Sequence, residues 1–197
     1  TGTLTLHSGV NDYTVLRLKD ENNSTISGNG IWGPLNKIVM DKSDGLLDSV
    51  IVTSPSFAGI SNTSTDYILK PLSGVLKFNN GLTNYLSSNL TDTVIFMSGS
   101  GLHIINGTVS TKTSLSTNSN TTFKIDGGNF EVGNDVSEHL LYKSGTDFDI
   151  INGNVIIAGT FSRALPSSLI DLNITNNSIF KVNNVGNNDA TRIGFDI

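Results

Sequence analysis

The chain has 197 residues, which is enough for one domain, or two small ones, with a substantial hydrophobic core. It contains no cysteine, so a disulfide framework and a thiolate metal site are both excluded. Charged residues make up only 15% of the chain and 17 acidic residues outnumber 12 basic ones, which argues against binding to a nucleic-acid backbone.

Small polar residues take the place of the missing charges. The chain holds 24 Asn and 20 Gly beside many Ser and Thr, and these residues favour turns and strands over helices. No apolar run approaches the roughly 18 residues that a membrane-spanning helix needs. The composition therefore predicts a β-rich protein without a transmembrane helix.

The first part of the chain, residues 1–68, predicts short and irregularly spaced strands. Leu4-Thr5-Leu6 is a candidate first strand. Ile26 and Ile31 flank a corner of Ser, Gly and Asn, and Val52 and Phe57 are separated by the same five-residue step. We expect these segments to form irregular N-terminal coils of a repeat that becomes regular further along the chain.

From residue 69 to residue 197 the repeat is clear. Each copy is an apolar-x-apolar strand, a four-residue corner of Gly, Asn and Ser, and a second apolar-x-apolar strand. The clearest copies span residues 95–104, 123–132 and 148–157, and weaker ones span 69–78 and 172–182. Phe195-Asp196-Ile197 would begin another copy, so we expect another chain, or more of the same protein, to cover that end.

The spacing of the repeat predicts its three-dimensional form. Equivalent residues recur mostly every 23 to 26 positions, which suits one turn of a three-sided parallel β-helix. A two-residue hairpin cannot join strands across a four-residue corner. A β-sandwich of short strands is the main alternative, but it does not predict the same corner at one register. We therefore expect a single all-β domain over 1–197, with about seven to eight coils of roughly 25 residues.

These coils resemble the right-handed parallel β-helix group, which includes pectate-lyase-like enzymes, phage tailspikes and surface adhesins. The resemblance lies in the apolar-x-apolar and Gly/Asn corner pattern over about residues 24 to 197. It implies a right-handed solenoid, and it is shared by proteins of unrelated function.

Alternation along each strand separates a core set from a surface set. The predicted core ladders are Ile95, Phe123, Phe148, Leu172 and Phe195; Met97, Ile125, Ile150, Ile174 and Ile197; Leu102, Phe130, Val155 and Phe180; and Ile104, Val132, Ile157 and Val182. Asn129 and Asn154 are expected to stack their side-chain amides between coils.

The outward positions give the predicted binding surface. Its members are Phe96, His103, Lys124, Glu131, Asp149 and Ile156. We expect Lys124 to neighbour Asp149, and His103 to neighbour Glu131, one coil apart. Outward Phe96 and Ile156 would be covered by a loop, a neighbouring subunit or a ligand.

Candidates for catalysis are sparse. Polysaccharide cleavage would need paired carboxylates, and the best candidates are Asp126, Asp147, Asp149 and Glu131. No nucleophile elbow or phosphate loop occurs, and no metal site is predicted. Calcium in the Asp-Gly or Asn-Gly corners is the only cofactor considered.

The sequence favours a non-enzymatic structural or attachment module of a virion, phage tail or fibre-type surface assembly. Such a module would present a rigid β-helix to other subunits or to a glycan receptor. We expect a homo-oligomer, which could be a trimer, in an extracellular, virion or cell-surface location. The alternative is a secreted or cell-surface carbohydrate-active β-helix protein, either a polysaccharide lyase or hydrolase or an adhesin.

Overall fold

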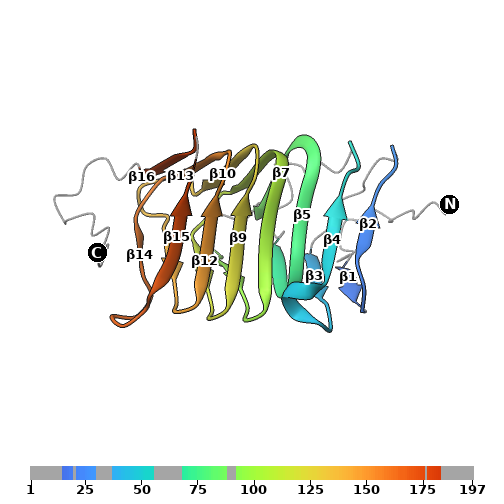
Figure 1. Cartoon of the computed structure of the whole chain (residues 1–197), viewed down its shortest axis with the longest axis horizontal. Coiled ribbons are helices and arrows are strands. Elements are labelled where there is room, and N and C mark those ends of the chain that lie inside the picture. Colours follow the sequence, from blue (N-terminus) through green and yellow to red (C-terminus); the bar gives the residue numbers. More distant parts are fainter. Residues whose placement is uncertain are drawn as a thin grey trace.

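A computed structural model describes residues 15–19, 21–29, 37–55, 68–87, 92–175 and 177–182. These residues form a parallel β-solenoid of about six turns, in which successive coils stack side by side along the long axis (Figure 1). The predicted parallel β-helix is therefore confirmed, with somewhat fewer turns than the seven to eight expected. Within the described residues, no helix is long and apolar enough to cross a membrane.

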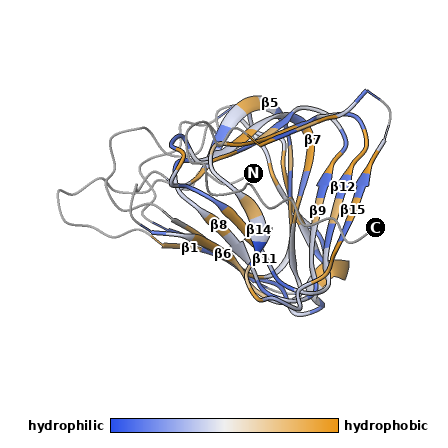
Figure 2. Cartoon of the chain, turned by 90° about the vertical axis from the view of Figure 1, so that its left-hand side faces the viewer, coloured by the Kyte–Doolittle hydropathy of each residue, from blue (hydrophilic) through white to orange (hydrophobic). Residues whose placement is uncertain are grey.

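Each complete coil contributes one strand to each of three faces, which enclose a triangular section (Figure 2). Face 1 contains β1 (Val15–Lys19), β3 (Lys37–Asp41), the start of β5 (Ile68–Ser87), β6 (Val94–Phe96), β8 (Leu115–Thr117), β11 (Leu140–Tyr142) and β14 (Phe161–Arg163). Face 2 contains β2 (Ser24–Ile26), β4 (Ser49–Val52), the middle of β5, the first half of β7 (Ser100–Thr111), β9 (Thr121–Ile125), β12 (Thr146–Ile150) and β15 (Ile170–Ile174). Face 3 contains the ends of β5 and β7, then β10 (Asn129–Val132), β13 (Asn154–Ile157) and β16 (Ile179–Val182). The short 3-10 helix η1 (Gly45–Leu47) lies between β3 and β4.

The core consists of apolar side chains stacked from coil to coil. Phe123 pairs in register with Phe148, and Phe130 with Val155, as the repeat predicted. The rings of Phe123 and Phe148 are parallel to within 9° with centroids 4.9 Å apart, and both are fully buried. Stacked aromatic rings at this separation add to the free energy gained from burying their surface.

The coil before Phe123 corrects the predicted alignment of all four core ladders. Ile125 pairs with Ile104 and not with Met97. Phe130 pairs with Val109 and Val132 with Thr111, not with Leu102 and Ile104. Phe123 pairs with Leu102 of β7, not with Ile95, because Ile95 belongs to a face-1 strand. Ile95 and Met97, predicted to point inward, are 47% and 39% exposed, whereas the predicted outward residue Phe96 is fully buried. The predicted ladder was thus shifted by one face at this coil. Phe96 lies in the core, with its ring centroid 4.9 Å from that of Phe123.

The corners between face 2 and face 3 use Gly and Asn for stereochemical reasons. Gly128 has a φ of +83°, and a Cβ there would come within 2.1 Å of the Gly107 carbonyl oxygen on the preceding coil. Only glycine permits that approach of one backbone to the next. The Asn154 side-chain amide donates to the Asn129 side-chain carbonyl at 2.8 Å, which confirms the predicted stack between these two coils.

The corners between face 1 and face 2 use buried hydroxyl groups. Ser100, Thr121 and Thr146 each begin a face-2 strand, and each donates its hydroxyl to the carbonyl three residues earlier. The Thr146 hydroxyl also lies 2.7 Å from that of Thr117 and 3.1 Å from that of Thr121. These hydroxyls satisfy buried carbonyls where the chain bends, so part of the Ser and Thr content is structural.

Candidate binding surface

The outer side of face 2 carries an aligned row of polar side chains. The register from β5 to β15 places Lys77, His103, Lys124, Asp149 and Asn173 side by side. Lys124 therefore neighbours Asp149, as the sequence predicted, and Asn173 donates to the Asp149 carboxylate at 3.2 Å. The row changes from basic to acidic between β9 and β12.

His103 is the half-buried member of this row. Its Nε2 atom is buried and makes no hydrogen bond to any described residue, and it lies 3.9 Å from the Asp126 carboxylate. Burial lowers the pKa of His103, the charges of Lys124 and Lys77 lower it further, and Asp126 opposes them in part. The imidazole is therefore neutral near pH 7, and Asp126 forms its ion pair with Lys124, at 3.6 Å.

The predicted binding residues do not form a single surface. Glu131 lies on face 3 between Ser110 and Ile156, so the expected contact between His103 and Glu131 is wrong. Ile156 is partly exposed beside Glu131, and Phe96 is in the core. His103, Lys124 and Asp149 remain together on face 2.

The four carboxylates predicted as catalytic candidates do not form one cluster. Asp147 and Asp149 lie on the outer side of β12, and Asp171 pairs with Asp147 in register. Burial raises the pKa of Asp147, and the charges of Asp149 and Asp171 raise it further. This is a locally acidic patch in which burial and the neighbouring charges disfavour the ionised form of Asp147.

Asp126 lies apart from this patch. Asp147 pairs with Thr122, four positions before Asp126, and four strand residues span about 13 Å. Paired glycosidase carboxylates are separated by roughly 5 to 9.5 Å, so Asp126 and Asp147 do not form such a pair in this geometry. In the described parts of the chain, no cluster of three or more His, Asp or Glu side chains is arranged to hold a metal ion. Calcium binding in the corners stays a prediction.

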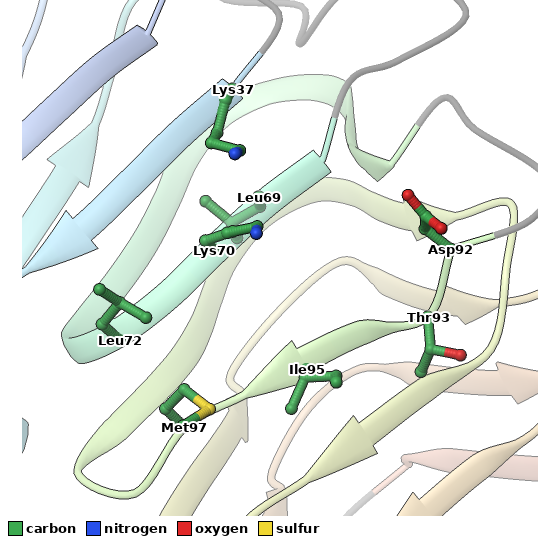
Figure 3. Close-up of a pocket in the computed structure, with 8 residues that line it drawn as sticks. All are labelled: Lys37, Leu69, Lys70, Leu72, Asp92, Thr93, Ile95 and Met97. Carbon is green, nitrogen blue, oxygen red and sulfur yellow. The ribbon is translucent and has the colours of Figure 1, made fainter.

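A groove on face 1 was not foreseen from the sequence. It has a volume of about 620 Å³ and lies between the start of β5 and β6 (Figure 3). Its lining combines aliphatic and charged side chains, namely Lys37, Leu69, Lys70, Leu72, Asp92, Thr93, Ile95 and Met97. The misassigned exposure of Ile95 and Met97 concealed it, because both were expected in the core.

Comparison of the chain with protein-family models, with curated proteins and with solved structures gives no match in any of the three. The protein is therefore classified by its fold alone, as a parallel β-solenoid.

Proposed function

We propose that the protein is a non-enzymatic structural and attachment module of a virion, phage tail or cell-surface assembly. In this role a rigid solenoid presents its outer faces to neighbouring subunits or to a receptor such as a glycan. We expect these contacts at the three predicted binding residues that lie together in the face-2 row, His103, Lys124 and Asp149.

The observation that supports this proposal is the continuity of the stack. Each strand from β7 to β13 has a parallel neighbour on both sides, and the side chains beneath them form one buried core. Repeated backbone pairing and packing of this kind produce a stiff element whose surface residues keep fixed spacings. Stiffness and fixed spacing suit a scaffold, and neither requires a reactive centre.

Association in solution tests the assembly role. Light scattering on the purified chain should give a mass above that of a monomer at micromolar concentration. Lys124→Glu should weaken association because it reverses one of the two lysine charges of the face-2 row, whereas Lys181→Glu in β16 on face 3 should not. A monomer at every accessible concentration would contradict the assembly role.

A carbohydrate-active enzyme is the second candidate, and the raised pKa of Asp147 is the observation that favours it. A raised pKa lets a carboxyl keep its proton to higher pH, which is what a general acid needs. Turnover of a polysaccharide that is abolished by Asp147→Asn and kept by Asp126→Asn would replace the attachment proposal by this one. We expect no polysaccharide turnover by the unaltered protein or by either variant.

A further inference from the structure

The groove on face 1 lies on the outer side of two neighbouring strands, the start of β5 and β6 (Figure 3). These strands belong to different sheets, and the Met97 N–H donates to the Pro71 carbonyl at 3.0 Å where they come together. A ligand of the groove would therefore lie across the outward side chains and not between the two backbones. The volume of about 620 Å³ is within the range of small-molecule sites.

Three aliphatic side chains line one part of the groove. Leu72, Ile95 and Met97 each follow a buried residue, so all three point to the outer side of the solenoid. They are between 37% and 47% exposed. No aromatic side chain is among the described residues that line the groove. Flat rings usually stack on aromatic side chains, so this lining suits an alkyl chain better than a ring.

Two lysines line the neighbouring part of the groove. Lys37 pairs with Ile68, and Lys70 lies two residues further along β5, so both lysines point outwards from adjacent strands. Neither ammonium group forms an ion pair with a described residue. The charge of Lys70 is the largest cause that lowers the pKa of Lys37, and burial is a smaller cause. An anion bound beside both ammonium groups would relieve their mutual repulsion.

Asp92 limits where such an anion can lie. It is on the β6 side of the groove, two residues before that strand begins, and Figure 3 shows it apart from the two lysines. In the described part of the chain, no ion pair joins Asp92 to Lys37 or Lys70. Its carboxylate would repel a second negative charge on the β6 side. The groove is therefore suited to one anionic group, held on the side of the lysines.

We propose that this groove binds a single-chain amphiphile, that is, an alkyl chain with one anionic head group such as a carboxylate or a sulfate. The head group contacts Lys37 and Lys70, and the alkyl chain covers Leu72, Ile95 and Met97. All five side chains lie on one outer face, so a ligand resting on that face contacts both kinds at once. The site is separate from the face-2 row, and it does not depend on the attachment role.

The test titrates the full chain with hexyl, octyl and decyl sulfate, each below its critical micelle concentration. The chain contains two methionines, and their methyl signals can be followed by NMR. Met97 lines the groove and Met40 is in the core, so the Met97 signal should shift while the Met40 signal stays in place. Each two added methylenes should strengthen binding about three- to tenfold, because they cover exposed apolar surface.

Three variants test the charges of the groove. Lys70→Gln should weaken octyl sulfate binding about three- to tenfold, because it removes one of the two cations. Asp92→Asn should strengthen it about two- to threefold, because a nearby negative charge is lost. Lys181→Gln, which removes an exposed lysine from face 3, should bind as the unaltered protein does. Added sodium chloride should weaken binding to the unaltered protein.

Several results would overturn the proposal. They are no binding at millimolar octyl sulfate, an affinity that does not depend on chain length, and equal binding of an alkyl trimethylammonium ion. A Met40 shift as large as that of Met97 would also overturn it, because the amphiphile would then be entering the core. Binding to vesicles of anionic lipid without binding of the dissolved amphiphile would assign the groove to a membrane surface instead. Association of the chain is measured separately, so none of these results bears on the assembly role.

Discussion

At the scale of single residues, two neighbours in β6 have opposite environments. Phe96 is fully buried against Phe123, and Ile95 is nearly half exposed. Phe96→Ala should lower the free energy of unfolding by about 3–5 kcal/mol through lost burial and a cavity. Ile95→Ala should lower it by only about 1 kcal/mol, since nearly half of the side chain is already exposed. Urea denaturation of both variants checks this, and equal losses would contradict the assignment of the two faces.

His103 gives the protein a stability that depends on pH. Its folded-state pKa is depressed, mainly by burial, so the unfolded chain binds the proton more readily. The stability that neutral His103 contributes is therefore fully present above its unfolded pKa of about 6.5 and is lost as the pH falls towards its folded pKa. Unfolding measured between pH 8 and pH 5 should show this loss. His103→Asn should show a flatter profile over the same range, and an identical profile would refute the assignment.

The contribution of Asp147 to stability should have the opposite dependence on pH. Burial and the neighbouring Asp149 and Asp171 raise its folded-state pKa, so the folded protein binds the proton more readily than the unfolded chain. Its favourable contribution is present below the unfolded value of about 3.9 and is lost as the pH rises through the folded pKa. Asp147→Asn should therefore stabilise the protein at pH 7. The difference from the unaltered protein should vanish near pH 3, which thermal unfolding at both pH values can establish.

At the scale of elements, the corners decide whether one coil can lie on the next. A Cβ at Gly128 would collide with the backbone of Gly107, and the φ of +83° adds strain. Gly28 has a φ of +103° but nothing within 4 Å of such a Cβ. Gly128→Ala should cost several kcal/mol of stability and Gly28→Ala about 1–3 kcal/mol. Comparable losses in thermal denaturation would show that backbone strain, not coil contact, dominates.

Most of the strand stacking could be predicted from the sequence, because alternation and Gly/Asn corners recur together. The pairings of Phe123 with Phe148 and of Phe130 with Val155 followed from that pattern. The phase of the preceding coil could not be predicted, because every coil has apolar-x-apolar strands on three faces. Leu102 precedes its partner Phe123 by 21 residues, and Phe123 precedes Phe148 by 25. The shared corner pattern instead aligned Ile95 with Phe123 and so assigned Ile95 to the wrong face.

The candidate surface was predicted less completely for a related reason. Lys124 and Asp149 lie within the regular part and were paired as expected. The groove lies where the face-1 sheet is interrupted beside Pro71. A periodic pattern predicts only the features that recur in every coil, so it could not predict this single interruption. Pro71 is buried at the start of β5, but its effect on the sheet depends on the neighbouring β6, which the predicted repeat had aligned with another face.

At the scale of the whole molecule, contacts are made between successive coils. Stability should therefore vary along the axis, as in other solenoids. Amide exchange should be slowest in β9, β10, β12 and β13, which pair with a strand on both sides, and faster in β15 and β16, which pair with one strand among the described residues. Mass spectrometry of peptides after deuterium labelling can measure the gradient. Uniform protection along the chain would contradict it.

The matching of Asn129 with Asn154, 25 positions apart, has a consequence for how such a chain can change over generations. Neighbouring coils have the same corner and the same backbone spacing. One coil can therefore be lost or duplicated without altering the fold of the other coils. Each such event would shorten or lengthen the rod by about 4.8 Å. The length of the solenoid can therefore change in evolution by whole coils, without any change in the residues that make its contacts.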